Sequence, residues 1–283
     1  MQSPGRADLD EQFHRLVSQP DAAIDLAEGA LLIARTAYPE LDVPVQLARL
    51  EQLGATLAGR LDPGLAAPER VVTLNRYLFD ELGFRPNVDD YYDPRNSFLN
   101  DVLERRLGIP ITLSVVYMAI GRRVGLPLQG VSFPGHFLVR CPLEQGLLVL
   151  DPFLGGMSLT LKDLQQRLRE ARGSEVPPGA IAGQLAPARH RDILARMLRN
   201  LKSIYLSREE HLRALPLMDW LVLVAPDQPV EVRDRGMAWL KLECYRAALT
   251  DLEQYLGLAP EADDAAEVRG HVLELRRGVA RLN

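Results

Sequence analysis

His136 and Asp151 are the residues of this sequence whose types and spacing could do acid–base chemistry. His136 follows a Pro-Gly pair in GVSFPGHFLVR (130–140), and Asp151 closes the apolar run LLVLD (147–151). An imidazole held by a carboxylate adopts one tautomer and can serve as a general base. Three interpretations of His136 are open: a buried histidine that fixes the local fold, part of a hydrolase or transferase site, or a metal ligand.

The segments that carry these two residues predict a β-hairpin. HFLVRC and LLVLD are rich in strand-forming residues and are separated by PLEQG. A register symmetric about that turn pairs Arg140 with Leu147 and, by the same sum of residue numbers, His136 with Asp151. Directly opposed residues have Cβ atoms about 4.5 to 5.5 Å apart. We therefore expect a hydrogen bond between the imidazole and the carboxylate, which a slip of one residue would abolish.

The cysteines give no support to a metal site or a disulfide. Cys141 and Cys244 lie far apart, and neither belongs to a paired-ligand motif. One histidine and one aspartate, without a third ligand at a diagnostic spacing, are too few to indicate a metal. Both cysteines are expected to be small buried apolar residues, and the sequence indicates no metal and no cofactor.

Amphipathic helices dominate the chain before the hairpin. Apolar residues recur at three- and four-residue intervals in segments 21–38, 43–61 and 68–84. RPNVDDYYDPRN (85–96) has the composition of an ordered loop. A helix begins again near Ser97.

Polar and aromatic residues of this loop allow two interpretations. Asn96 and Asn100 in NSFLND could form the rim of a ligand cleft, but helix capping and loop hydrogen bonds are the favoured interpretation. The pair Tyr91 and Tyr92 is more typical of packing than of recognition.

The segment GIPITLSVVYMAIGRRVG (108–125) predicts a buried helix, because it is apolar nearly all round. Pro110 suits the first helical turn, where a missing amide hydrogen does no harm. Arginines occupy the last turn, and Gly125 ends the helix.

The carboxyl-terminal third of the chain repeats itself after a Pro/Gly/Ala-rich stretch at 173–188, which predicts a domain boundary. Ala214 and Ala248, like Pro226 and Pro260, are 34 residues apart. That period is typical of tetratricopeptide helix pairs. Two repeats are fewer than a free solenoid needs, so we expect them to pack on the first domain or on terminal helices.

Composition narrows the classes of partner. The 33 basic and 38 acidic side chains among 283 residues give a net charge of -5 and no broad basic field, which argues against nucleic acid binding. No apolar run reaches about 18 residues, and MQSPGRADLDEQFHRL carries charges where a signal peptide needs an apolar core. We therefore expect a cytoplasmic protein without a membrane partner.

Several long segments resemble a known family. LNRYLFDELGF, YYDPRNSFLNDVLERRLGIPITLSVVYMAIGRRVGLPLQGVSFPGHFLVR and LLVLDPFLGG, followed by the repeats, are similar to the bacterial SirB-type proteins. The resemblance implies an α+β fold. Its parts are a mainly helical transglutaminase-like (papain-like) domain with a small antiparallel sheet at 1–185, and α-helical tetratricopeptide repeats at 186–283. The wider superfamily uses a Cys-His-Asp triad for acyl transfer, in which His136 and Asp151 match the second and third members.

The first member of that triad has no match. The resemblance places the nucleophilic cysteine in a G-x-C turn at a helix start, where the helix lowers the pKa of the thiol. This sequence reads GIP and carries Pro110 there, and neither Cys141 nor Cys244 occupies the helix start. Ser114, one turn further along, is an alternative nucleophile. A mid-helix serine more often donates a hydrogen bond to the carbonyl four residues back.

Two classes of function follow. The first is a non-catalytic or weakly catalytic transglutaminase-like protein, a pseudoenzyme that binds a protein or peptide partner through its repeats or cleft in a regulatory role. The alternative is a hydrolase or protease-like acyl-transfer enzyme that uses His136 and Asp151 with a non-cysteine nucleophile. Pro110 favours the first, because a triad loses nearly all nucleophilic catalysis without the attacking group.

Overall fold

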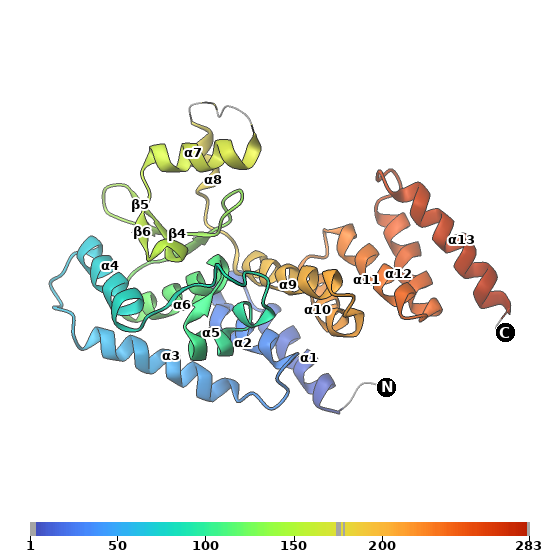
Figure 1. Cartoon of the computed structure of the whole chain (residues 1–283), viewed down its shortest axis with the longest axis horizontal. Helices are drawn as coiled ribbons and strands as arrows, with labels where there is room; N and C mark the ends of the chain where they lie inside the picture. Colours follow the sequence, from blue (N-terminus) through green and yellow to red (C-terminus); the bar gives the residue numbers. More distant parts are fainter. Residues whose placement is uncertain (1–3, 174–176, 178, 282–283) are drawn as a thin grey trace. The chain divides into compact units, whose positions relative to one another are not determined.

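The chain forms two compact units in a computed structural model that describes residues 4–173, 177 and 179–281 (Figure 1). The units are Met1–Met197 and Leu198–Asn283, and the division between them falls inside helix α9 (His190–Ser207). The sequence-based boundary after residue 185 lies ahead of this helix. Within the described ranges no helix is both long and apolar enough to cross a membrane.

Helices precede the sheet in the first unit, as the apolar periodicity predicts. The α-helices are α1 (Pro4–Val17), α2 (Leu26–Arg35), α3 (Val43–Ala58), α4 (Ala67–Asn75), α5 (Leu99–Arg105) and α6 (Pro110–Arg123). Shorter turns are the 3₁₀ segments η1 (Asp21–Ala23), η3 (Pro94–Asn96) and η4 (Pro152–Leu154) and the π-helical η2 (Arg76–Glu81), which continues α4. The predicted helix at 68–84 therefore ends as a π turn.

Helix α6 is the buried centre of this unit. It begins at Pro110 and buries ten of its residues, which confirms the sequence prediction. The loop before α5 is tied to it, because the Thr112 hydroxyl donates to the Asn96 carbonyl at 2.8 Å and accepts from the Ile109 amide at 3.1 Å. Asn96 is fully buried.

The predicted hairpin is present within a four-stranded antiparallel sheet of order β3-β4-β5-β6. Its strands are β3 (Gln129–Val131), β4 (Leu138–Pro142), β5 (Leu147–Asp151) and β6 (Met157–Ser158). Two further short strands, β1 (Arg85–Pro86) and β2 (Leu107–Gly108), pair in parallel beside α6.

The register of the hairpin corrects the prediction. Arg140 pairs with Val149 rather than Leu147, because Pro142 extends β4 and pairs with Leu147 itself. The four-residue loop then closes with a hydrogen bond from the Leu143 amide to the Gly146 carbonyl, and Gly146 adopts the positive φ of 101° that this turn needs. The shift is two residues, so every side chain stays on its predicted face.

The sheet is covered on both faces (Figure 1). Leu138 and Val149 point toward α7 (Leu161–Arg172) and α8 (Ala180–Gln184), where they share a core with Leu164, Leu168 and Ile181. Alternate residues such as Cys141 point to the opposite face, where α6 lies. Helix α7 therefore lies over the face of the sheet that carries the start of β4 and the end of β5.

The second unit confirms the repeats. Its helices are the second half of α9, α10 (His211–Val224), α11 (Pro229–Lys241), α12 (Tyr245–Leu258) and α13 (Ala265–Arg281). Helices α10 and α12 have bounds that differ by the 34-residue period. The turns before them also repeat, since Glu209 and Glu243 both adopt positive φ, at 58° and 59°. Gly236 of α11 permits close packing, because an added Cβ would lie 2.9 Å from Leu252 of α12.

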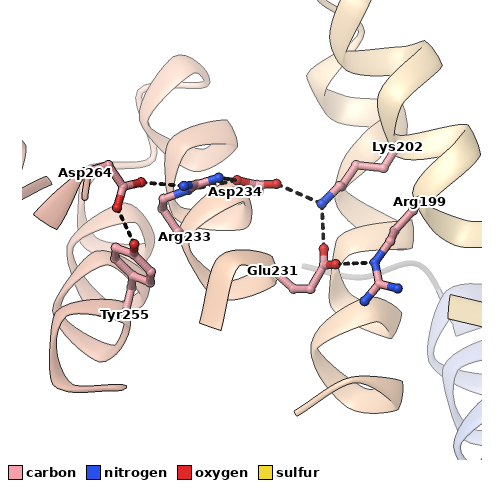
Figure 2. Close-up of polar contacts among 7 residues, drawn as sticks. All are labelled: Arg199, Lys202, Glu231, Arg233, Asp234, Tyr255 and Asp264. Atoms are coloured by element: carbon pink, nitrogen blue, oxygen red, sulfur yellow. Dashed lines mark hydrogen bonds and ion pairs between the residues drawn. The ribbon is translucent and has the colours of Figure 1, made fainter. Parts of the chain in front are cut away.

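A chain of charged side chains, of which Glu231 and Lys202 are buried, links the helices of this unit (Figure 2). Glu231 of α11 is 2% exposed and accepts hydrogen bonds from Arg199 at 2.6 Å and Lys202 at 2.5 Å, both from α9. Lys202 also donates a hydrogen bond to Asp234 at 2.8 Å. Arg233, the residue before Asp234, forms an ion pair with Asp264. Because a buried charge is costly without its partner, these contacts fix how the helices align.

We expect Glu231→Gln to lower the free energy of unfolding by about 2 to 4 kcal/mol, because it leaves Arg199 and the buried Lys202 ammonium short of a counterion. Chemical denaturation measures the change. The matched control is Glu253→Gln, which breaks the more exposed pair with Arg276 and should cost less than about 1 kcal/mol. Equal effects of the two substitutions would show that the buried charges do not hold the unit together.

Candidate functional site

Asp151 ends β5 as a buried, fully partnered carboxylate. It is 3% exposed. Its Oδ1 accepts the Phe153 amide at 3.0 Å, and its Oδ2 accepts Arg167 Nη1 at 2.6 Å. Alternation along β5 turns Asp151 to the α7 face, and Arg167 follows the sheet-facing Leu164 by three residues, so both side chains meet. The carboxylate is therefore paired with an arginine.

His136 lies in the turn before β4, partly exposed. Its backbone amide donates to the Phe133 carbonyl at 2.9 Å. Burial lowers the pKa of the imidazole, the charges of Arg167 and Arg196 lower it further, and Asp151 and Glu170 oppose this. The balance favours the neutral imidazole.

The prediction that His136 and Asp151 form a hydrogen bond is wrong. In the part of the chain that the structure describes, the imidazole has no hydrogen-bond partner, although it feels the charge of Asp151. The register shift removes the direct opposition of the two residues. Arg167, from a helix that sequence reasoning did not connect to the hairpin, takes the carboxylate instead.

Arg196 of α9 completes the charged surroundings of His136. Its guanidinium stacks over the Phe137 ring, with 5.4 Å between Cζ and the ring centroid. Burial lowers the pKa of Arg196, and the nearby Tyr91 opposes this. The Arg196 guanidinium makes no hydrogen bond or ion pair to residues 4–173 or 179–281.

The expected nucleophile position holds no nucleophile. Pro110 is the first residue of α6, with Ile109 as its cap. Ser114 is fully buried one turn later, and its hydroxyl donates to the Pro110 carbonyl at 2.7 Å. The proton of this hydroxyl is thus held by its own helix, which is the favoured structural interpretation of a mid-helix serine.

The two cysteines differ in burial. Cys141 is buried in β4, and burial raises the pKa of its thiol, so the predicted apolar role fits. Cys244 is exposed in the turn before α12, which corrects the prediction that both are buried. The 34-residue period places this position in a repeat turn, where a side chain points outward.

The loop residues separate into structural and exposed ones. Asn96 accepts a hydrogen bond from Asn87 at 3.0 Å and donates to the Asp90 carbonyl at 2.7 Å, which confirms its structural interpretation. The buried Asn100 carbonyl oxygen has no partner in the described chain. Tyr91 and Tyr92 touch edge to face but are 42% and 71% exposed, more than the packing interpretation predicts.

Sequence reasoning missed Arg167 and Arg196. Arg167 sits among several arginines of an amphipathic helix, and Arg196 lies far along the chain from His136, so no local pattern marks either. The described residues contain no group of three or more His, Cys, Asp or Glu side chains that could hold a metal ion.

Comparison with known proteins shows which family this chain belongs to. The transglutaminase-like superfamily model matches residues 46–199, more than half of the chain, and a tetratricopeptide repeat model matches residues 201–272. A UPF0162 protein of Xylella fastidiosa is 44% identical over 93% of this chain and 94% of its own length. The chain belongs to the UPF0162/SirB1 family.

Other members of the UPF0162/SirB1 family match almost as completely. A UPF0162 protein of Vibrio cholerae is 32% identical over 87% of this chain and 90% of its own length. Protein SirB1 of Salmonella typhimurium is 28% identical over 87% and 91%. The resemblance found in the sequence is therefore confirmed, with a transglutaminase-like unit followed by tetratricopeptide repeats.

The charges around His136 predict how its pKa should shift when one of them is removed. Arg167→Gln removes a cation that lowers this pKa and frees the Asp151 carboxylate that raises it, so the pKa of His136 should rise. NMR titration of the imidazole measures it. Arg172→Gln, at an exposed arginine of the same helix, serves as the control, and a His136 pKa that stays unchanged in Arg167→Gln would contradict the assignment.

The same pKa makes stability depend on pH. Because the folded-state pKa of His136 lies below its ordinary value of about 6.5, the unfolded chain binds more protons as the pH falls through this window. The contribution of His136 to the free energy of unfolding should therefore be fully present above about pH 6.5 and be lost as the pH falls below it. His136→Gln should flatten part of this slope in denaturation curves. Identical slopes for wild type and His136→Gln would refute the linkage.

Proposed function

We propose that this protein is a non-catalytic member of the transglutaminase-like superfamily that binds a protein partner in a regulatory role. The observation that carries the proposal is Pro110 at the start of α6. A thiolate there would be stabilised by the helix amino terminus, and proline has no group that can attack a carbonyl carbon.

The rest of the triad-like arrangement supports this proposal. A triad aspartate holds the imidazole in the tautomer that accepts a proton. Here both oxygens of Asp151 are engaged, one by Arg167 and one by the Phe153 amide. Ser114 points its hydroxyl proton into its own helix. His136 thus lacks both an orienting carboxylate and a neighbouring nucleophile.

The second unit supports the binding part of the proposal. Tetratricopeptide repeats stack helix pairs into surfaces that bind other proteins. A cavity of about 290 Å³ lies in this unit, lined by Leu240, Tyr245, His271, Glu274 and Leu275. Its apolar and titratable side chains suit a partner segment with an apolar anchor beside a polar group.

We expect no specific labelling by activity probes. The full-length protein is incubated with a fluorophosphonate for activated serines and a vinyl sulfone for activated cysteines, and the labelled peptides are mapped. Wild type, Ser114→Ala and His136→Gln should show the same background, because no nucleophile is activated. Labelling of Ser114 or Cys141 that disappears in folded His136→Gln would instead establish the acyl-transfer alternative.

Partner binding is tested from the exposed Cys244, which precedes the cavity residue Tyr245. A maleimide-linked photo-crosslinker attached there should capture a partner, since the buried Cys141 is not expected to react. The captured protein is then purified and titrated against wild type and His136→Gln. Binding that survives His136→Gln separates recognition from catalysis, and a captured protein that shows no affinity in this titration would count against the proposal.

A further inference from the structure

A cavity of about 220 Å³ lies in the first unit. Its lining comes from the start of α2, from α6, from the loop between α6 and β3, and from His190 at the start of α9. The lining does not include His136, Asp151 or Ser114. The triad-like arrangement therefore gives this cavity no role.

Much of the lining is apolar. Val115 and Met118 of α6 and Leu126 of the following loop are buried. Ala119 of α6 lies on the same lining and contributes only a methyl group. An apolar cavity of about 150 Å³ can hold a benzene ring. The volume here is therefore sufficient for one aromatic ring with a small substituent.

His190 brings a hydrogen-bond acceptor to this lining. Its Nδ1 lies 2.8 Å from the Ile24 carbonyl oxygen. Because a carbonyl oxygen only accepts, Nδ1 carries a proton, and Nε2 of the neutral ring is then an acceptor. Nε2 has no hydrogen-bond partner in the part of the chain that the structure describes. A ligand in the cavity can supply the missing donor.

Two backbone contacts hold His190 in place. Its amide donates to Asp21 Oδ2 at 2.9 Å, and the Arg191 amide donates to Asp21 Oδ1 at 3.0 Å. Together with the bond to Ile24, they fix the first turn of α9 to η1 and the residue after it. A ring that is already fixed loses little freedom when a ligand binds, so the acceptor is preorganised.

The charged side chains of the lining neutralise each other. Arg122 Nη2 lies 3.0 Å from Asp25 Oδ2. Asp25 Oδ1 also accepts from the Ala27 amide at 2.9 Å. An ionised ligand would have to compete with this pair and leave one of its members without a partner. The cavity therefore suits a neutral ligand.

We propose that this cavity binds a small neutral phenol. The ring packs against Val115, Met118 and Leu126, and the hydroxyl donates to Nε2 of His190. An apolar pocket with one well-placed polar group is the usual form of a small-molecule site. This site goes beyond the proposed partner-binding function and does not depend on it.

The backbone of the lining favours a free small molecule over the tyrosine side chain of a peptide. The Ile24 carbonyl accepts from His190. The Leu128 amide donates to the Leu126 carbonyl at 2.9 Å. Extended peptides gain affinity by pairing with unoccupied backbone groups, and these two groups are already engaged.

The test compares p-cresol with p-xylene, which has the same shape but a methyl group in place of the hydroxyl. Binding to the full-length protein is titrated by NMR, including the methyl signals of Val115 and Met118. Binding of p-cresol should saturate. His190→Asn keeps a donor for the Ile24 carbonyl but has no equivalent of Nε2. It should weaken p-cresol binding about tenfold and leave p-xylene binding unchanged, because only the phenol uses the acceptor.

A second variant tests the cavity without touching His190. Ala119→Leu lengthens a side chain of the lining and should weaken both ligands at least about tenfold, because it fills the space of the ring. The matched control is Ala55→Leu, which makes the same change at an exposed position of α3 outside the lining. It should change neither affinity.

Three results would each overturn the phenol site. They are p-cresol binding that does not saturate, p-cresol affinity that is unchanged in Ala119→Leu, and equal effects of His190→Asn on the two ligands. N-acetyltyrosinamide that binds more tightly than p-cresol would assign the cavity to a peptide and overturn the small-molecule site. Ala119→Leu decides the question alone where His190→Asn does not fold.

Discussion

The arrangement of the transglutaminase-like unit depends on the need to pair the buried carboxylate of Asp151. A carboxylate at the end of a covered strand needs a cation or several donors, because its desolvation is otherwise too costly. Arg167 supplies that cation only if α7 packs on this face of the sheet, with Leu164 and Leu168 filling the core beneath it. One ion pair therefore couples the position of a helix to the electrostatics around His136.

The part of the fold set by local patterns could be predicted from the sequence. Apolar periodicity located helices α2, α3 and α4, Pro110 marked the start of α6, and the 34-residue offset gave helices α10 and α12 with matching bounds. These features depend on neighbours within a few turns of the chain. The strands β3 and β6 escaped prediction because they are three and two residues long, too short for a period to emerge.

The site could be predicted only in part, for a different physical reason. The types of His136 and Asp151 were informative, but their contacts depend on pairing across the chain. Whether Pro142 belongs to the strand or to the turn shifts the register by two residues. Arg167 and Arg196 come from helices whose arginines look alike in sequence, and only packing decides which one faces inward. The charges around Glu231 escaped prediction in the same way, since Arg199 and Lys202 reach it from another helix.

Pro110 stands at the start of α6, where the family resemblance places a nucleophilic cysteine. The first turn of a helix tolerates proline because its amide would have no intrahelical acceptor and its fixed φ is already helical. The same position is where a thiolate would gain most from the helix dipole. Pro110 is thus compatible with the start of α6, and Asp151 meets a structural demand of its own, the pairing with Arg167. The pairing with Arg167 thus accounts for Asp151 without any catalytic role, as the proposed function requires.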